Sequence, residues 1–283
     1  MMRGVRQRLA GGGRDVLVQS RTVVRSRSET MISVDAIQEG LSRGEFFLEY
    51  LPTVNLADER CVGAEALARW RRPSGVVPPR HFLPHIEETP VAGLLTYWVI
   101  ETVVEELGEW LRAHPEAHLS INVPPELFGR GGLHDAATKT GLAALQRQII
   151  LEVTERGLPD RLRVAAIEAA ARTGYRIALD DVMLRGADLA ILSRCPLDVI
   201  KIDRSLIAKI TPDVPRPDWL RCLPALLRST RLEVVAEGVE TEAQVVALRA
   251  ASVPMAQGFY FSRPVGAVEF RTYYAKTRGR PTE

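Results

Sequence analysis

The chain has 283 residues, of which 46% are hydrophobic and 25% are charged, an ordinary composition for a globular protein. After the first thirty residues, 30 basic side chains stand against 33 acidic ones, and this slight acidity argues against a nucleic-acid-binding face. The longest apolar run, residues 91–100, has ten residues, whereas a membrane span needs about 20. Three widely spaced cysteines without a CxxC pair argue against a zinc ribbon and a disulfide framework. We therefore expect a cytoplasmic protein that has neither a nucleic acid nor a membrane as its partner.

The first thirty residues differ in composition from the rest of the chain. They hold seven arginines against Asp15 and Glu29, together with three consecutive glycines and little apolar periodicity. This pattern predicts a basic, flexible N-terminal tail over residues 1–30, with a functional basic arm as the alternative. Residues 31–283 are predicted to form one domain.

From residue 32 onward, short apolar strands alternate with helical segments. We expect helices over residues 94–111, 160–173, 241–250 and 267–276, the third of them capped by Thr241. Eight strands are predicted, over residues 46–51, 62–68, 119–123, 149–153, 176–180, 199–202, 233–236 and 255–260. This alternation over about 240 residues favours a closed α/β barrel of the (β/α)₈ TIM-like class. No GxGxxG motif follows the first strand, which counts against a dinucleotide-binding fold.

Polar side chains stand at or just past the ends of these strands. Because the carboxyl ends of barrel strands meet at one mouth, we expect these side chains to converge there. They are Glu65, Asn122, Glu152, Glu155, Asp180, Asp181, Lys201, Asp203, Glu237, Glu240 and Gln257. Taken singly, a strand glutamate is typical of a solvent-facing edge, and an Asp-Asp pair is typical of a helix cap. Their joint placement at the strand ends favours a functional site.

Five or more carboxylates in one small volume repel one another unless a positive charge compensates them. Divalent metal ions are the simplest compensation, and an oxygen-only set without Cys or His selects Mg²⁺, Mn²⁺ or Ca²⁺. The adjacent carboxylates of Asp180 and Asp181 suit two ions, which can clamp the attacking and leaving oxygens of a phosphoryl displacement. Lys201 can orient or deprotonate a water, or neutralise a phosphate. His81 and His85 lack a third ligand and are interpreted as surface residues.

The strand-end residues occur in motifs that resemble the EAL family of cyclic di-GMP phosphodiesterases, over about residues 35–275. The resemblance implies a barrel whose first strand is antiparallel to the others. It also implies hydrolysis of one phosphodiester bond of cyclic di-GMP, which gives linear pGpG. The motifs are Glu65-Ala66-Leu67 with Arg69, Ser120-Ile121-Asn122, Leu151-Glu152-Val153-Thr154-Glu155, Leu179-Asp180-Asp181, Ile200-Lys201-Ile202-Asp203, Val235-Ala236-Glu237-Gly238-Val239-Glu240 and Gln257-Gly258-Phe259.

The resemblance further implies a two-metal site with Mg²⁺ or Mn²⁺ as the ions and Ca²⁺ as an inhibitor. The first ion would be held by Glu65, Asn122, Glu152 and Asp180. The second ion would be held by Asp180, Asp181 and Glu237.

By the same resemblance, Lys201 contacts the attacking water, Gln257 supports the water and the metal shell, and Glu237 also acts in catalysis. The substrate is implied to be bound by Arg69, Leu67 and Asp203. The loops behind the metal ligands are implied to be held by Glu155 and Glu240.

Two positions depart from the family pattern. Residues 182–188 read Val-Met-Leu-Arg-Gly-Ala-Asp, where the family usually has Phe-Gly-x-Gly-Tyr-Ser-Ser, so Met183 and Arg185 replace glycines. That loop is implied to position Asp181 and to communicate across a homodimer. We therefore expect a weakly held second metal and low basal hydrolysis. Leu51 replaces a glutamine that the family places near the substrate base.

Three functions follow from these observations. The intact Lys201 and the full ligand set favour a metal-dependent phosphodiesterase, which a regulatory protein partner could activate. The altered loop and Leu51 favour the alternative, a catalytically weak module that acts as a cyclic di-GMP receptor or binds a protein partner. A nuclease or another phosphodiesterase is the third possibility.

Overall fold

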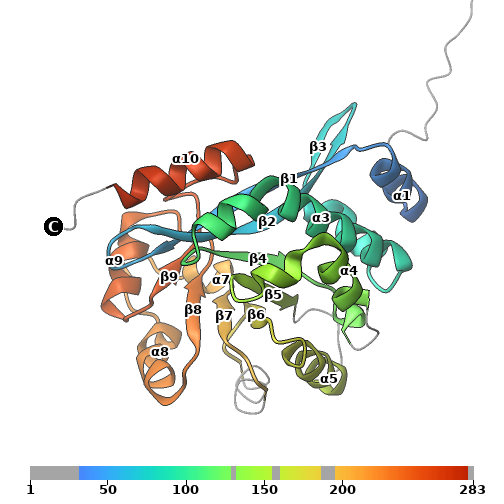
Figure 1. Cartoon of the computed structure of the whole chain (residues 1–283). Helices are drawn as coiled ribbons and strands as arrows, with labels where there is room; N and C mark the ends of the chain where they lie inside the picture. Colours follow the sequence, from blue (N-terminus) through green and yellow to red (C-terminus); the bar gives the residue numbers. More distant parts are fainter. Residues whose placement is uncertain (1–31, 129–131, 155–159, 186–194, 280–283) are drawn as a thin grey trace, which may run out of the picture. The chain divides into compact units, whose positions relative to one another are not determined.

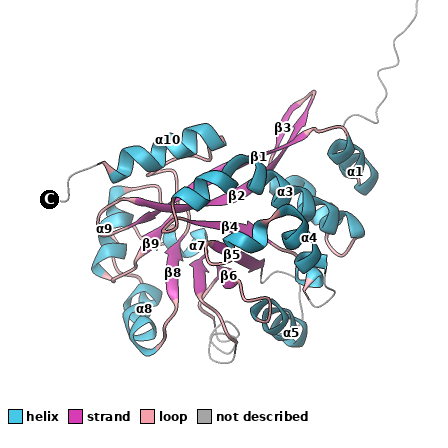
Figure 2. Cartoon of the chain, in the orientation of Figure 1, coloured by secondary structure: helices cyan, strands magenta, loops and turns pink. Residues whose placement is uncertain are grey.

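The computed structural model describes residues 32–128, 132–154, 160–185 and 195–279, whose arrangement is shown in Figures 1 and 2. The tail predicted over residues 1–30 lies outside the described residues. The strands are β1 (Phe46–Asn55), β2 (Cys61–Arg72), β3 (Gly75–Val77), β4 (His118–Asn122), β5 (Ile149–Thr154), β6 (Arg176–Val182), β7 (Val199–Ile202), β8 (Glu233–Ala236) and β9 (Met255–Ala256). The α-helices are α1 (Val34–Ser42), α2 (Pro79–Ile86), α3 (Pro90–Ala113), α4 (Gly132–Thr140), α5 (Asp160–Ala171), α7 (Arg204–Ile207), α8 (Asp218–Ser229), α9 (Glu242–Ala250) and α10 (Ala267–Arg278).

Eight of the described strands close into a barrel. The hydrogen-bonded order β1-β9-β8-β7-β6-β5-β4-β2 returns to β1 through a β1–β2 pairing, while β3 extends the sheet beyond β2. Strand β1 is antiparallel to both β2 and β9, and the pairs from β2 through β4 to β9 are parallel. Helices lie around the outside of the strands (Figure 1). This confirms the predicted (β/α)₈ barrel with an antiparallel first strand.

The ends of several elements differ from the prediction. The last barrel strand was expected over residues 255–260 but ends at Ala256, because Gly258 at φ 155° turns the chain toward Val239. The first strand continues to Asn55 instead of ending at residue 51. Helices α2 and α8 were not predicted, and each contains an internal proline, Pro84 or Pro224, which counts against a helix in the sequence. The predicted cap of α9 is confirmed, because Thr241 and Gln244 form a reciprocal capping box.

The barrel interior is packed by an apolar layer. One buried side chain from each of five consecutive strands contributes to it, with Val62 of β2 packed alongside. The five are Ile150, Ala178, Val199, Val235 and Met255. A larger apolar core lies between the strands and the surrounding helices. The apolar layer fills the barrel below the polar residues described next and gives them a rigid floor.

The β1–β2–β3 ribbon extends past the other strands (Figure 2). A separate aromatic core packs against it, in which Phe46 stacks on Trp70 at 5.4 Å between ring centroids and Phe82 meets both rings edge-on. Trp70 is therefore a packing residue, and the ribbon is held rigidly beside α2 and α3. None of the described helices is long and apolar enough to cross a membrane.

Candidate metal centre

The polar residues predicted at the strand ends form a layer directly above the apolar floor of the barrel. Five of them lie two residues after a floor residue on their own chain segment, and alternate residues of a strand share one face. The pairs of floor and polar residue are Ile150 with Glu152, Ala178 with Asp180, Val199 with Lys201, Val235 with Glu237, and Met255 with Gln257. Simple strand periodicity therefore gathers these five residues into the barrel mouth.

Lys201 lies at the centre of this layer and is 2% exposed. Its Nζ is 2.8 Å from Glu237 Oε1, 2.9 Å from Glu65 Oε2, 2.9 Å from Glu152 Oε2 and 3.4 Å from Asp180 Oδ1. Asn122 joins the group by donating its Nδ2–H to Glu65 Oε1 at 3.0 Å. The side chains come from strands that are far apart in sequence, so only the closed barrel brings them together.

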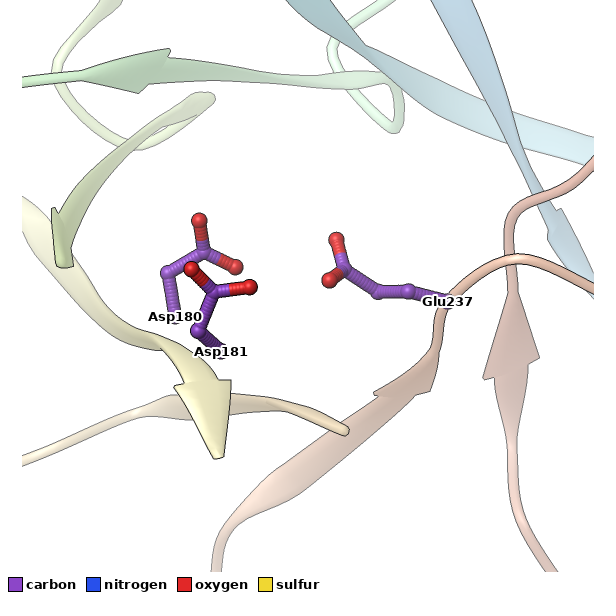
Figure 3. A group of neighbouring side chains, drawn as sticks. All are labelled: Asp180, Asp181 and Glu237. Carbon is purple, nitrogen blue, oxygen red and sulfur yellow. The ribbon is translucent and has the colours of Figure 1, made fainter. Parts of the chain in front are cut away.

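Asp180 and Asp181 lie in a bulge at the end of β6. Consecutive residues of a regular strand point to opposite faces, but the β6–β7 register shifts between Leu179 and Val182, and Asp181 has a left-handed φ of 57°. Aspartate tolerates this conformation better than most residues. Both carboxylates consequently point toward Glu237 (Figure 3), and the three residues offer oxygens that all lie within 4.8 Å of one another.

Burial and mutual repulsion control protonation in the layer. Desolvation, reinforced by the charge of Glu65, raises the pKa of Glu152 well above its usual value. Desolvation also raises the pKa of Asp180 and raises that of Glu237 to about 8. Desolvation acts on Glu65 in the same direction, but Lys201 and Asn122 outweigh it and lower the pKa of Glu65. The pKa of Lys201 is raised well above its usual value, because its four carboxylates outweigh desolvation.

The donor set fits divalent cations. Among the described residues, three of the four buried side-chain atoms without a hydrogen-bond partner belong to this layer: Glu152 Oε1, Asp180 Oδ1 and Gln257 Oε1. Five carboxylates against one ammonium group leave an excess of four negative charges when all are ionised, which two divalent cations would balance. All the potential ligands are oxygens, the atoms that Mg²⁺ and Mn²⁺ prefer.

Gln257 is held by the antiparallel first strand. Its Nε2–H donates to Thr53 Oγ1 at 2.8 Å, and the main-chain oxygen of Leu51 lies 3.4 Å from the same nitrogen. This leaves its buried Oε1 without a partner. Leu51 lies opposite Glu65 in the β1–β2 register, so its side chain is on the same face as a predicted metal ligand.

The predicted substrate-binding residues lie farther out. Leu67 and Arg69 follow Glu65 at two-residue spacing along β2, so all three share one face of the strand. Arg69 is paired with Glu49 of β1 at 2.7 Å. Asp203 is buried and caps α7, where its Oδ1 accepts a hydrogen bond from the Ser205 main chain at 2.8 Å.

The remaining predicted residues are placed differently. Glu155 lies outside the described residues. The side chain of Glu240 is exposed, and its main-chain N–H donates to Gln244 Oε1 at 2.8 Å. His81 and His85 are exposed on α2, as predicted. Glu49 and Thr53 were not predicted from the sequence, although the two-residue alternation along β1 places both on the same face as Leu51.

The loop after Asp181 turns by a route that we did not expect. Glycines stand at positions 183 and 185 in the family pattern, yet Leu184 between them has the left-handed φ of 54°. Met183 instead packs on the core and accepts a hydrogen bond from Ser205 Oγ at 3.4 Å. Asp181 lies beside Asp180 and Glu237, with oxygens of the three residues within 4.8 Å of one another. Residues 186–188 of the same loop lie outside the described residues.

The chain is similar to known proteins over most of its length. A family model described as EAL domain matches residues 34–264. The probable cyclic di-GMP phosphodiesterase PdeB of Escherichia coli is 32% identical over 238 residues, which are 83% of this chain and 45% of PdeB. The bifunctional diguanylate cyclase/cyclic di-GMP phosphodiesterase MucR of Pseudomonas aeruginosa is 31% identical over 237 residues, 82% of this chain and 35% of MucR. The chain thus spans less than half the length of these curated relatives.

Solved structures agree with the sequence similarity. The phosphodiesterase PaMucR in complex with cyclic di-GMP superposes with a TM-score of 0.74 at 30% identity, covering 84% of this chain and 98% of that one. The EAL enzyme Bd1971 with bound cAMP and cyclic di-GMP gives a TM-score of 0.75 at 28% identity, covering 85% of this chain and 68% of that one.

Proposed function

The chain belongs to the EAL domain family, and on that premise we propose that it is a metal-dependent phosphodiesterase that hydrolyses cyclic di-GMP to linear pGpG. The observation that carries the proposal is the polar layer itself: one buried lysine, five carboxylates and three partnerless buried oxygens at the mouth of one barrel. The cyclic di-GMP complex of PaMucR supports the choice of substrate.

Each residue of the layer has a chemical role in this proposal. Mg²⁺ or Mn²⁺ would be held by Glu65, Asn122, Glu152 and Asp180, and a second ion by Asp180, Asp181 and Glu237. When bound, the ions supply Lewis acidity at a phosphoryl oxygen and make a water acidic enough to attack at neutral pH. In the reaction, the water oxygen loses a proton and bonds to phosphorus, the bond from phosphorus to the ribose 3′ oxygen breaks, and that oxygen takes up a proton, which leaves a 5′-phosphate and a 3′-hydroxyl.

Lys201 orients the attacking water. Its ammonium already contacts the carboxylates Glu65, Glu152 and Glu237, so it is fixed beside the metal ligands. The partnerless Oε1 of Gln257, fixed from its nitrogen side by Thr53, accepts a hydrogen bond from the same water. Arg69, Leu67 and Asp203 bind the substrate outside the metal layer.

Further parts of the proposal extend beyond the barrel. We place the reaction in the cytoplasm, in keeping with three cysteines that form no disulfide. Ca²⁺ would inhibit, Glu155 and Glu240 would hold the loops behind the metal ligands, and homodimerisation and a regulatory protein partner would tune the rate. The basic tail over residues 1–30 would take no part in the chemistry.

Hydrolysis is tested by incubating the purified chain with cyclic di-GMP and Mn²⁺, followed by chromatography of the products. We expect pGpG, and we expect EDTA to abolish its formation. Glu237→Gln should be inactive, whereas Glu233→Gln should retain wild-type turnover, because Glu233 lies at the opposite end of β8 and pairs with Arg176 at 2.8 Å. A product other than pGpG, or equal activity of the two variants, would overturn the proposal.

A binding-only role is the second candidate function. It is favoured by Leu51, which sets an apolar side chain opposite Glu65, and by the left-handed conformation of Leu184 in the loop after Asp181. The same experiment separates the two functions, because a receptor binds cyclic di-GMP in calorimetry but releases no pGpG.

A further inference from the structure

An ion pair holds Arg69 on the β1–β2 ribbon. The Nε–H of Arg69 donates to Glu49 Oε2 at 2.7 Å, and its Nη1 donates to the main-chain oxygen of Ala68 at 3.1 Å. The Arg69 side chain is only 12% exposed. A guanidinium group has five N–H donors, and the other three have no acceptor within the described part of the chain. Arg69 is therefore fixed from one edge, with N–H groups left over for a ligand.

The strand register explains this contact. Glu49 lies opposite Leu67, and Leu51 lies opposite Glu65. Directly opposed residues of an antiparallel pair share a face, and diagonal neighbours are within reach of long side chains. Glu49 is thus on the same face as Glu65 and diagonal to Arg69. Arg69 is four residues from Glu65, about 13 Å along the strand, so it contacts a part of the substrate remote from the bond that breaks.

Restraint of this arginine has an energetic consequence. Arginine loses much rotamer freedom when it is immobilised by a ligand, at a cost equivalent to a roughly 2- to 12-fold loss of affinity. A guanidinium group that Glu49 already holds has lost part of that freedom before the ligand arrives. A contact remote from the reacting bond acts on ground state and transition state alike, so it changes KM and Kd more than kcat.

We propose that Glu49 is a positioning residue that presents Arg69 to cyclic di-GMP; this rests on the proposed function. Simple electrostatics predicts the opposite effect, because removing a carboxylate beside an arginine strengthens the attraction of an anion. Weaker binding of cyclic di-GMP after removal of the Glu49 carboxylate therefore indicates that Glu49 positions Arg69, whereas tighter binding indicates that Glu49 competes with the ligand for Arg69.

The test measures the Kd of cyclic di-GMP by calorimetry with Ca²⁺ in place of the catalytic metal, and KM and kcat with Mn²⁺. Glu49→Ala should weaken binding by roughly 5-fold, the middle of the entropic range above, and should raise KM with little change in kcat. Glu49→Gln keeps an oxygen acceptor and should restore most of the affinity. The matched control is Glu59→Gln, since Glu59 pairs with Arg249 at the same 2.7 Å and is 31% exposed against 30% for Glu49.

A double-mutant cycle with Arg69→Ala completes the design. If Glu49 acts through Arg69, Glu49→Ala should have no further effect on Kd in the Arg69→Ala background. Unchanged thermal unfolding of each variant shows that the fold is intact. Unchanged or tighter binding by Glu49→Ala would overturn the role of Glu49 and leave the proposed function standing. A wild-type chain that neither binds nor hydrolyses cyclic di-GMP would overturn the proposed function, and this inference with it.

Discussion

The side-chain nitrogen of Lys201 lies 2.8 Å from Glu237 Oε1, although one residue comes from the interior of β7 and the other from the segment after β8. Glu65 and Glu152 each accept a hydrogen bond from the same nitrogen at 2.9 Å. An ammonium group has three N–H donors, so these two hydrogen bonds leave one N–H group for Glu237 or a water molecule, and Asp180 Oδ1 has no hydrogen bond. Lys201 is therefore the counter-charge around which the polar layer is built, and it compensates only part of the negative charge.

Removal of Lys201 should slow the chemical step. We expect Lys201→Ala to lower kcat by roughly 10²-fold or more, the contribution of one acid–base group, with a smaller change in substrate affinity. Initial rates over a range of cyclic di-GMP concentrations give kcat and KM separately. An unchanged kcat with a raised KM would make Lys201 a substrate anchor instead.

The same lysine should stabilise the metal-free barrel. Removing one partner of a buried ion pair typically costs about 3–5 kcal/mol, so Lys201→Met in EDTA should lose unfolding free energy on that scale. Saturating Mn²⁺ should recover much of the loss, because it replaces the missing positive charge. Urea unfolding measures the effect, with Lys209→Met at an exposed position as the control. Equal losses with EDTA and with Mn²⁺ would contradict a counter-charge role.

Metal binding should strengthen as pH rises. The pKa of Glu237 is raised to about 8 by burial, so near neutral pH this carboxyl holds a proton that a metal ion must displace. The Mn²⁺-induced rise in Tm should therefore increase from about pH 6 to about pH 8 and then level off. The stability of the metal-free protein depends on pH in the opposite direction. Protonated Glu237 contributes fully to this stability below the pKa that its carboxyl has in the unfolded chain. The contribution is lost as pH rises through the pKa of the carboxyl in the folded protein. An equal Mn²⁺ effect on Tm at both pH values would refute this linkage.

The loop after Asp181 should limit turnover. Leu184 occupies a left-handed φ of 54°, which costs a non-glycine residue about 1–2 kcal/mol. Grafting Phe-Gly-Thr-Gly-Tyr-Ser-Ser over residues 182–188 should raise kcat and lower the Mn²⁺ concentration that gives half activity. Leu184→Gly alone separates relief of the local backbone from the rest of the graft. This explanation would be ruled out if the wild-type protein turned over substrate at low Mn²⁺ as fast as relatives that keep the glycines, and if the graft left its kcat unchanged.

Gly258 should be needed to place Gln257. A Cβ added to Gly258 would lie 2.1 Å from the main-chain oxygen of Val239, at a φ of +155°. Gly258→Ala should lower the unfolding free energy by about 1–3 kcal/mol or more and should also reduce kcat, because the backbone next to Gln257 must move. Gly44→Ala is the control, since Gly44 also has a positive φ of +68° but nothing within 4 Å of its added Cβ. Similar effects of the two substitutions on kcat would contradict the link to Gln257.

The barrel could be predicted from the sequence because its signals are local. The two-residue alternation that places Val199 in the apolar layer and Lys201 in the polar layer can be read directly from the sequence of residues 199–202. The turn after Ala256 was missed, because it depends on hydrogen bonds between the segment at Gln257 and Val239, which no local pattern reports. The prolines inside α2 and α8 likewise argued against helices that tertiary packing nevertheless stabilises.

The members of the polar layer could be predicted, but their geometry could not. Strand periodicity alone would point Asp180 and Asp181 to opposite faces, and only the bulge with Asp181 at φ 57° turns both toward Glu237. The partnership of Glu49 with Arg69 depends on the β1–β2 register, in which Glu49 lies opposite Leu67 and diagonal to Arg69. The roles of these residues in metal binding and catalysis remain predictions for the variants above.

Binding of Mn²⁺ shows whether the polar layer is a two-metal centre. Titration of metal-free protein with Mn²⁺, followed by electron paramagnetic resonance of the free ion, counts the bound ions and their affinities. We predict two ions per chain, the second weaker than the first, and markedly weaker binding of both by Glu152→Gln. A wild-type chain that binds no Mn²⁺, or a Glu152→Gln variant with wild-type affinity, would show that the polar layer is not this metal centre.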